Sequence, residues 1–421
     1  MAGQTLTAAD AILKELYVGP IVEQLNQKKY LLEQIERDSD HVEHTGRRAV
    51  VPVHKNRNWG IKSIADGGTL PTAGRQEWAD AIIPIRAHTL AIELTDQSIE
   101  ATKSDKGAFI SLLTAETQGA ATDLSKNMNR QAFGLGDGRL VPTVESTKTG
   151  GAEAKILFKD ARDIQYIKVG MIVDLVLEAT GLIGEGVLGT EILTRKLSNT
   201  VDLTEVTTSK ASKGAVTYAS KSNVYVQGSY KNEIDGLRNI TENERELHSI
   251  NSASAGNEYW KGNVIKAEKA AAGEDLFEQL ADNVGAQGNG EVEVFLTSRG
   301  IKRRLANTYQ SQKRFNDKTA TRIEGGYSAI MVNEVPVVSD DDAPKTFAFG
   351  LNKSAFKWFQ QTDPGWLQQG NGGIFHLKTG IAVAGEFSNA WLAFFRWYAA
   401  LGCVAPNRTG QISECADDNP F

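Results

Sequence analysis

The chain has 421 residues, of which 41% are hydrophobic and 23% charged, and its net charge is −6. This composition is ordinary for a globular protein of two or three domains, and the acidic balance excludes an overall basic surface for nucleic acid. No apolar run is long enough to span a membrane, and the first residues lack the basic start and apolar core of a secretion signal. The two cysteines, Cys403 and Cys415, are expected to be reduced thiols.

The N-terminal segment is predicted to form a helical arm. Apolar residues recur at helical spacing through residues 5–38, with a break expected at Gly19–Pro20. An acidic turn follows, made by Asp38, Asp40 and Glu43. Such an arm either closes its own core or docks on a neighbouring molecule.

A long β-hairpin is predicted from Arg47 to Leu94, because apolar residues alternate there with period two on both sides of a polar tip at Ser63–Gln76. The apolar positions change from odd to even numbers between Ile85 and Leu90, so a bulge or bend is expected near Arg86–Thr89. A two-stranded ribbon is at best marginally stable alone in water. It therefore needs a surface to lie on, either its own domain or another subunit.

The first arm of this hairpin is basic and has no acid between its cations. These cations are Arg47, Arg48, Lys55, Arg57 and Lys62. Their sign is complementary to that of the acidic turn in the N-terminal arm, which favours correct register between neighbouring molecules.

One long helix is predicted over Ser104–Phe133. Its apolar side consists of Phe109, Leu112, Leu113, Leu124 and Met128. Ser104 or Asp105 is expected to cap the start, and the glycines after Phe133 to end it. Gly119 weakens the middle by about 1 kcal/mol relative to alanine. The helix is either part of a large core or a strut between contacts at its two ends.

Short strand-like runs with turn residues between them fill 139–230 and predict an inserted β-barrel or sandwich. The runs are Lys155–Phe158, Met171–Glu178, Glu191–Leu197, Val201–Leu203, Ala215–Tyr218 and Val224–Gln227.

Mixed helices and strands are predicted after Tyr230. The expected helices are Gly273–Gln287 and Ser298–Gln310, the second capped by Ser298. The expected strands are Glu291–Thr297, Ile330–Val338 as a pair around Asn333-Glu334, Thr346–Phe349, Gly373–Val383 and Ala390–Val404. The last strand is long and aromatic and is predicted to be the centre of a sheet.

Motifs that match catalytic or metal sites are better explained as turns and surface residues. Gly184–Gly189 matches G-x-G-x-x-G, but it lies in an all-β context rather than on a strand-to-helix turn, so a hairpin turn is expected. His41 and His44 have no cysteine nearby, and Asp340–Asp342 is expected to be a solvated turn. No catalytic, cofactor or metal site is expected, and the chain is predicted not to be an enzyme.

The strongest charge feature lies between Arg299 and Arg322, where Asp317 is the one acid. Its candidate contact residues are Arg299, Lys302, Arg303, Arg304, Lys313 and Arg314. The segment is a solvated helix face, a surface for phosphates, or a docking site for an acidic neighbour. It lacks interleaved aromatic residues, so any contact with DNA is expected to be non-specific.

The order of these elements resembles that of the major capsid proteins of tailed bacteriophages, the Hong Kong 97-type capsid fold, over most of the chain. Local sequence is similar as well. The similar segments are Asn127–Gly134 followed by Gly136-Asp137-Gly138, Gly228-Ser229-Tyr230 leading into Asp235–Arg238, and Pro406-Asn407-Arg408.

The resemblance implies an α+β fold with an N-terminal arm, an extended β-hairpin loop, a long spine helix, axial and peripheral domains, and an inserted all-β domain. The implied boundaries are 1–46 for the arm, 47–94 for the extended loop, 95–138 for the spine helix and peripheral domain, 139–230 for the insertion, 231–374 for the axial domain and 375–421 for C-terminal strands that return to the peripheral domain. The insertion is a departure from the minimal family pattern.

The resemblance also implies a function. It predicts a major capsid protein that assembles with itself, as hexamers and pentamers, into an icosahedral shell around double-stranded DNA in the host cytoplasm and virion. The loop residues expected to contact a neighbouring subunit are Arg47, Arg48, Lys55, Arg57, Trp59, Lys62, Asp66, Gly67, Gly68, Leu70 and Pro71. Separate scaffolding, portal and decoration proteins are expected partners, and no membrane is. Two rival interpretations stay open: an encapsulin shell around cargo enzymes, and a β-rich protein that binds glycans or cell surfaces.

Overall fold

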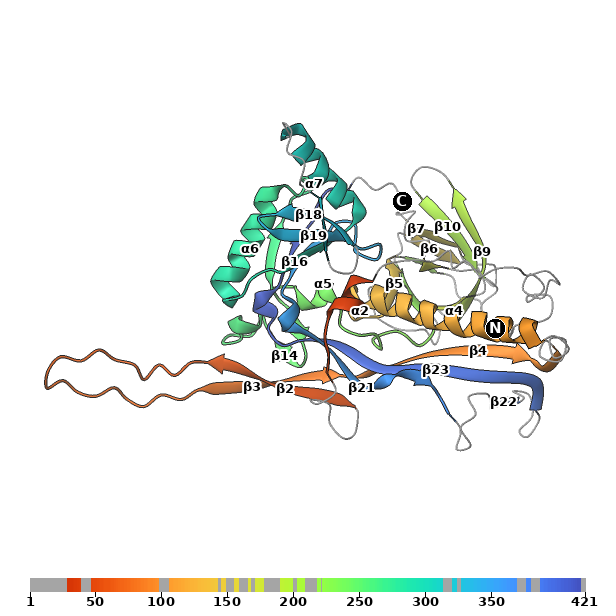
Figure 1. Cartoon of the computed structure of the whole chain (residues 1–421), viewed down its shortest axis with the longest axis horizontal. Coiled ribbons are helices and arrows are strands. Elements are labelled where there is room, and N and C mark those ends of the chain that lie inside the picture. The colour runs from red at the N-terminus through yellow and green to blue at the C-terminus, as the bar shows by residue number, and fades with distance from the viewer. Residues whose placement is uncertain are drawn as a thin grey trace. The chain divides into compact units, whose positions relative to one another are not determined.

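The computed structural model describes residues 29–38, 47–97, 106–142, 145–148, 155–158, 166–167, 171–177, 190–199, 203–208, 218–220, 222–312, 320–323, 327–368, 376–379 and 387–417. The chain divides into two units, each a mixture of helices and sheets as the α+β class predicts (Figure 1). Unit 1 comprises Met1–Val51, Ile82–Arg130 and Lys357–Ala400, and unit 2 comprises Pro52–Ala81, Gln131–Phe356 and Leu401–Phe421. Among the helices of these described ranges, none is long and apolar enough to cross a membrane.

Unit 1 is built on a five-stranded sheet around one long strand (Figure 1). This strand, β23 (Phe387–Cys403), pairs with β4 (Arg86–Thr95), β21 (Phe356–Trp366) and β22 (His376–Thr379). A short strand, β1 (Arg37–Asp38), runs parallel to β21. The prediction of a long, aromatic central strand is confirmed.

The predicted spine helix is present as α4 (Lys106–Ala132), whose 27 residues give a length of about 40 Å. Met128 is fully buried, as the helical spacing predicts. Ala120 packs with Ile92 of β4 and Ala393 of β23, so this stretch of the helix is held by the sheet. The residues predicted to cap its start lie outside the described part of the chain.

The N-terminal arm departs from its prediction where it is described. Helix α2 (Tyr30–Gln34) stops early, and residues 37–38 form a strand instead of continuing the helix. Trp358 explains the change, because its backbone N–H donates to the Glu36 carbonyl at 2.8 Å and its indole N–H to the Leu31 carbonyl at 3.1 Å. The prediction of a helix up to residue 38 is therefore wrong at its end. The earlier part of the arm lies outside the described residues.

The predicted hairpin is present as a two-stranded sheet of β2 (Arg48–Asn56) and β3 (Glu77–Pro84). Buried positions have odd numbers up to Ile83 and even numbers from His88 onward. The faces exchange across Ile85, which separates β3 from β4. This confirms the predicted change of face, with the break one residue before the expected region. Because of it, β3 pairs with β2 while β4 pairs with β23.

Unit 2 contains a seven-stranded sheet in the order β15-β24-β20-β16-β19-β18-β17. Its strands are β15 (Asn263–Lys266), β24 (Gly410–Ser413), β20 (Ala348–Leu351), β16 (Val294–Thr297), β19 (Val335–Ser339), β18 (Tyr327–Val332) and β17 (Ala320–Ile323). Helices α6 (Glu274–Gly288) and α7 (Arg299–Gln312) match their predictions. The Ser298 Oγ accepts the Ile301 N–H at 3.3 Å, which confirms the predicted cap of α7.

The core of this sheet is apolar and aromatic. Phe277 of α6 lies edge-on to Phe295 of β16 with ring centroids 4.9 Å apart, and Leu305 of α7 is fully buried. The predicted strand pair turns at Asn333-Glu334, both of which have positive φ. Two residues of positive φ form the turn whose twist suits a tight hairpin.

A second, eight-stranded sheet in unit 2 has the order β11-β6-β7-β10-β9-β8-β12-β5. Its strands are β5 (Arg139–Pro142), β6 (Glu145–Lys148), β7 (Lys155–Phe158), β8 (Ile172–Leu177), β9 (Thr190–Asn199), β10 (Leu203–Thr208), β11 (Tyr218–Ser220) and β12 (Ser222–Val226). The runs predicted at 201–203 and 215–218 overlap β10 and β11 by one residue each, because these strands are rich in polar residues and lack apolar alternation. The G-x-G-x-x-G segment lies outside the described residues.

Short elements complete unit 2. They are α5 (Leu237–Ile240), β13 (Glu246–Leu247), β14 (Ile250–Asn251), η2 (Glu258–Trp260), η3 (Lys353–Ala355) and η4 (Pro406–Arg408).

Candidate assembly surface

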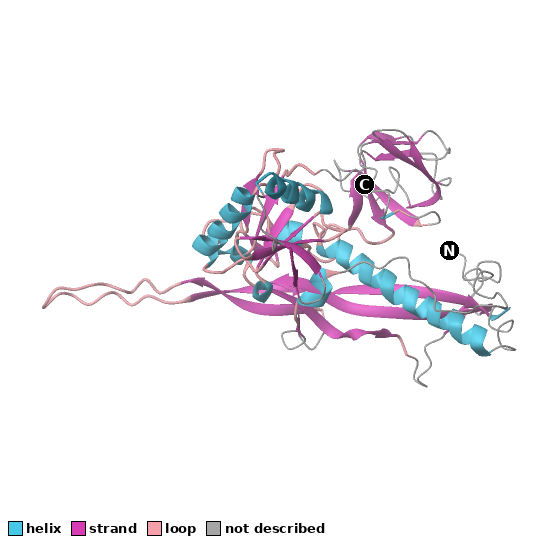
Figure 2. Ribbon diagram, turned by 45° about the horizontal axis from the view of Figure 1, so that its top comes forward, coloured by secondary structure: helices cyan, strands magenta, loops and turns pink. Residues whose placement is uncertain are grey.

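Between β2 and β3 the chain forms an extended loop of residues 57–76, whose two arms run side by side away from the strands (Figure 2). The arms join at a tight turn in which the Gly68 N–H donates to the Ala65 carbonyl at 2.9 Å. Gly67 has a φ of +74°, a conformation that glycine adopts without strain. Near the turn, the Lys62 Nζ donates across the loop to the Thr69 carbonyl at 3.4 Å. Local hydrogen bonds therefore shape the tip of the loop.

Large apolar side chains of this loop and the start of β3 lie in solvent. Their exposed fractions are 85% for Trp59, 89% for Ile61, 45% for Ile64, 78% for Leu70 and 64% for Trp78. In the described part of the chain, every exposed large hydrophobic side chain belongs to this group. Single exposed apolar residues are normal, but a group gathered on one projecting segment indicates a surface that another molecule covers.

The loop residues predicted from the sequence to make contacts are exposed, with one exception. Lys55 is half-buried, and its Nζ lies 3.8 Å from where a Cβ on Gly256 would stand. Backbone N–H groups, including that of Gly256, lower the pKa of the Glu258 carboxyl, and Lys55 lowers it further. The root of the loop thus lies against the segment before η2. The predicted contact residues do not include Ile61, Ile64 or Trp78, although these are large apolar side chains in or beside a polar tip.

One residue of the predicted acidic turn, Asp38, is not available to pair with the basic arm of a neighbouring molecule. Asp38 is 8% exposed, and its Oδ2 accepts a hydrogen bond from the Lys357 Nζ at 2.8 Å, which also makes an ion pair. The predicted complementarity between this turn and the basic arm is therefore wrong for Asp38, whose partner lies on β21 of the same unit. Asp40 and Glu43 lie outside the described residues.

The predicted basic segment is partly neutralised where it begins. The Arg299 Nη2 donates to the Asp341 Oδ2 at 2.7 Å, and its Nε also pairs with that carboxylate. Lys302 is half-buried, and burial lowers its pKa. Arg303 is exposed, and Arg304 is half-buried. The other two candidate residues, Lys313 and Arg314, lie outside the described part of the chain.

The three consecutive acids that follow β19 form the predicted turn, but the turn is not fully solvated. Asp340 is 2% exposed, and its Oδ1 accepts the Asp342 N–H at 2.9 Å. The Asp342 Oδ1 in turn accepts the Tyr166 hydroxyl at 3.0 Å. The predicted turn is confirmed, whereas its predicted solvation is wrong for Asp340, and all three side chains make contacts within the fold. Within the described residues, no group of three or more His, Cys, Asp or Glu is placed to hold a metal ion.

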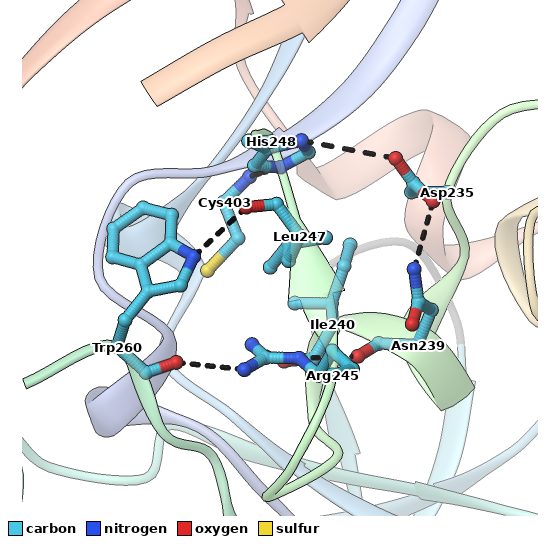
Figure 3. Close-up of polar contacts among 8 residues, drawn as sticks. All are labelled: Asp235, Asn239, Ile240, Arg245, Leu247, His248, Trp260 and Cys403. Atoms are coloured by element: carbon cyan, nitrogen blue, oxygen red, sulfur yellow. Dashed lines mark hydrogen bonds and ion pairs between the residues drawn. The ribbon is translucent and has the colours of Figure 1, made fainter. Parts of the chain in front are cut away.

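Arg245 organises a buried polar cluster in unit 2 that the sequence did not reveal (Figure 3). Its Nε, Nη2 and Nη1 donate to the carbonyls of Asn239, Ile240 and Trp260, each at 2.7 Å. Burial lowers the pKa of Arg245 to about 10. The Trp260 indole N–H donates to the Leu247 carbonyl at 3.1 Å. One guanidinium thus satisfies three backbone acceptors, two of them at the end of α5.

His248 closes the other side of this cluster (Figure 3). Its Nε2 accepts the Cys403 backbone N–H at 3.2 Å, which puts the proton of the neutral ring on Nδ1. Nδ1 lies 3.8 Å from the Asp235 Oδ2, too far for a hydrogen bond. Complete burial, with a smaller contribution from Arg245, lowers the pKa of His248 to about 3. A ring held neutral in this way braces the backbone and is a poor acid–base catalyst at neutral pH.

The cysteines are buried free thiols, as expected. Burial raises the pKa of Cys403 and of Cys415 to about 12 in each case, so neither is a reactive thiolate at neutral pH.

No protein-family model matches the sequence, and neither does any curated protein. Among solved structures, a chain of the Cyanophage A-1(L) capsid asymmetric unit matches with a TM-score of 0.54 and 13% identity, over 98% of this chain and 100% of the other. The chain has the fold of a phage capsid subunit. This confirms the capsid fold that the order of elements predicts.

Two further structures match with lower scores. A Mycobacterium phage Bobi structure has a TM-score of 0.46 and 11% identity, over 99% of this chain and 100% of the other. The holo-SrpI encapsulin complex from Synechococcus elongatus has a TM-score of 0.47 and 8% identity, over 99% and 97%. The fold assignment rests on the Cyanophage A-1(L) chain.

Proposed function

We propose that this chain is the major capsid protein of a tailed phage, a structural subunit that assembles with itself into hexamers and pentamers of an icosahedral shell around double-stranded DNA. The observation that carries the proposal is the extended loop, whose large apolar side chains lie in solvent on a chain with a capsid fold. A shell subunit makes heterologous contacts, which build a closed assembly when the geometry closes. A projecting loop with an unburied apolar group is what such a contact requires.

The loop would supply much of the contact energy. Fully burying an apolar side chain contributes about 1.5–3 kcal/mol, and Trp59, Ile61 and Leu70 are each more than three-quarters exposed. The exposed cations Arg57 and Lys62 lie in the same arm and would steer the encounter. The free energy of each loop contact is modest, but every subunit of a shell makes the same contact.

The sheets support an assignment of parts. We assign α4 and the strands around β23 to the peripheral domain (95–138 and 375–421), and the seven-stranded sheet to the axial domain (231–374). The eight-stranded sheet corresponds to the inserted domain (139–230), with 1–46 as the arm and 47–94 as the extended loop.

The remaining partners belong to the same proposal. A scaffolding protein would guide assembly in the host cytoplasm, and portal and decoration proteins would complete the virion. The exposed Arg303 on α7 is suited to non-specific contact with packaged DNA.

Size-exclusion chromatography and negative-stain microscopy of the expressed full chain test the proposal. Shells, tubes or capsomers are the expected result, and a monodisperse monomer would overturn it. DNA rather than cargo protein inside particles from the host distinguishes a phage shell from an encapsulin shell. A monomer that binds glycans would point to the rival surface-binding function.

The loop is tested by the triple variant Trp59→Ser, Ile61→Ser, Leu70→Ser. It should keep the circular dichroism spectrum and melting temperature of the wild type but remain as unassembled subunits. The matched control Ser63→Ala, Thr69→Ser, Thr72→Ser changes polar positions of the same loop and should assemble normally. Wild-type assembly by the triple variant would rule out the loop as the contact.

A further inference from the structure

The tip of the loop contains an Asp-Gly pair, Asp66-Gly67, in an open turn. Asp66 is exposed, and a Cβ built on Gly67 would meet nothing within 4 Å. The turn is closed by the hydrogen bond from the Gly68 N–H to the Ala65 carbonyl. Among the described residues, neither the Gly67 N–H nor the Asp66 carboxylate has a hydrogen-bond partner. Since the residue after Asp66 has no side chain, its backbone nitrogen can approach the neighbouring carboxyl carbon without hindrance.

The chain has two other Asp-Gly pairs, and in both the carboxylate is hydrogen-bonded and the glycine backbone is enclosed. The Asp137 Oδ1 accepts the Arg139 N–H at 3.0 Å, and its Oδ2 lies 3.5 Å from the Arg139 Nε. A Cβ on the following Gly138 would collide with the Ser229 carbonyl, so this backbone has no freedom to rearrange.

The third pair is held as firmly. The Asp235 Oδ1 accepts a hydrogen bond from the Asn239 Nδ2 at 2.8 Å. A Cβ on the following Gly236 would stand 2.5 Å from the Gly134 nitrogen, so the backbone is enclosed. The three pairs share their dipeptide and differ in their surroundings.

We propose that Asp66-Gly67 is a site of spontaneous isoaspartate formation in the folded chain. The Gly67 backbone nitrogen attacks the Asp66 Cγ, a C–N bond forms, and one water leaves with a carboxyl oxygen and the amide proton. Water then adds to the main-chain carbonyl of the resulting succinimide and breaks its bond to nitrogen. The water lost in the first step is regained in the second, so the mass is unchanged and no oxidant or enzyme is needed.

The modification changes the tip of the loop. It adds one atom to the backbone and moves the carboxylate onto the α-carbon, so the hydrogen-bonded turn can no longer close in the same way. An aged subunit would then dock its loop less well on a neighbour, and the site would limit the useful lifetime of unassembled protein. This consequence, unlike the modification itself, rests on the proposed function.

Peptide mapping of the full chain after incubation at neutral pH and physiological temperature tests the modification. Isoaspartate is expected to accumulate several-fold faster at Asp66 than at Asp137 or Asp235. Mapping also separates Asp66 from the two Asn-Gly pairs, Asn289-Gly290 and Asn371-Gly372, whose conversion would change the mass. Equal rates at the three aspartates in the folded chain would overturn the proposal.

Two controls locate the cause. In concentrated urea the three rates should converge, because the fold no longer protects two of them; a persistent excess at Asp66 would overturn the structural explanation. Asp66→Glu, which keeps the charge but disfavours the ring, should show no isoaspartate at the tip.

The effect on assembly is read separately. Aged wild-type protein should assemble more slowly than fresh protein, whereas aged and fresh Asp66→Glu should behave alike. If aged wild-type protein carries isoaspartate yet assembles at the fresh rate, the consequence for assembly is wrong while the modification stands. If neither protein assembles at any age, the proposed function fails, and the peptide map still decides the modification.

Discussion

Gly60 and Gly74 face each other across the extended loop with no room for a side chain between them. A Cβ on Gly60 would lie 2.8 Å from the Gly74 nitrogen and 2.8 Å from the Thr72 carbonyl. A Cβ on Gly74 would collide with the Asn58 side chain, whose Oδ1 accepts the Gly60 N–H at 2.7 Å. The two arms can approach this closely only because both positions are glycine.

Substituting either glycine should therefore distort the loop without unfolding the protein. We expect Gly60→Ala or Gly74→Ala to leave the melting temperature within a degree or so of the wild type, since the loop is exposed. Assembly measured by light scattering should fall at least several-fold. Gly119→Ala in α4 is the matched control: a Cβ there meets nothing within 4 Å, so it should stabilise the helix by up to about 1 kcal/mol. Normal assembly by both loop variants would show that the crossing is unimportant.

Periodicity predicted the elements that carry their own signal. The apolar spacing of α4 and the change of face near Ile85 are local features, and the structure contains both. The strand β21 was not predicted, because its segment Gln360–Asp363 is polar and its position is set by pairing with β23 and β1. The same pairing explains why the arm helix ends at Gln34.

In the candidate assembly surface and the Arg245 cluster, residues with a local signal could be predicted, whereas pairings set by the fold could not. Trp59 and Leu70 could be chosen because large apolar residues stand out in a polar tip. The role of Arg245 could not be found, because its three acceptors are backbone carbonyls that fold into place around it. Likewise the partner of Arg299 is Asp341, which is distant in the sequence. Charge patterns describe one segment at a time and miss such pairings.

Replacing Arg245 should destabilise unit 2 strongly. Arg245→Met removes the donors from three carbonyls, and each buried acceptor left without a partner costs about 1–3 kcal/mol. Arg245→Lys should recover only part of the lost free energy of unfolding, because an ammonium group cannot reach three separated acceptors as a guanidinium does. Urea unfolding measures the difference. The control Arg57→Met, at an exposed loop position, should change the free energy of unfolding by no more than about 0.5 kcal/mol. An equally small change in Arg245→Met would contradict the bracing role of the cluster.

Two buried histidines should make the protein sensitive to mild acid. Burial lowers the pKa of His248 to about 3 and that of His88 to about 4, from an ordinary value of 6.5. Below pH 6.5 the two histidines therefore bind protons in the unfolded chain but not in the folded chain. The free energy of unfolding falls as the pH falls from 6.5 toward the folded-state pKa values. Each histidine costs on the order of 1 kcal/mol per pH unit in that window and nothing above it.

Chemical denaturation at several pH values between 6.5 and about 4 measures this slope. His248→Gln and His88→Gln should each remove the contribution of one histidine to the slope of the free energy of unfolding against pH. The double variant should remove both contributions. An unchanged slope in the double variant would mean that other groups govern the acid response.

Reversing the charge of the basic arm should impair assembly without unfolding the subunit. Arg47, Arg48 and Arg57 are exposed, so Arg→Glu at all three positions leaves the core contacts in place. We expect assembly in low salt to slow at least several-fold, because the cations steer the loop toward an acidic surface of the neighbour. Raising the salt concentration should slow the wild type toward the rate of the variant, since screening removes the same attraction.

The acidic surface that meets this arm cannot depend on Asp38, which is buried against Lys357. Other acidic residues of the neighbour must therefore attract the arm. The salt dependence of the assembly rate measures this attraction even though those residues are not identified. Arg303→Glu reverses a charge on α7, outside the loop, and serves as the control. If the triple variant assembles at the wild-type rate in low salt, the arm has no electrostatic role, and the contact rests on the apolar side chains alone.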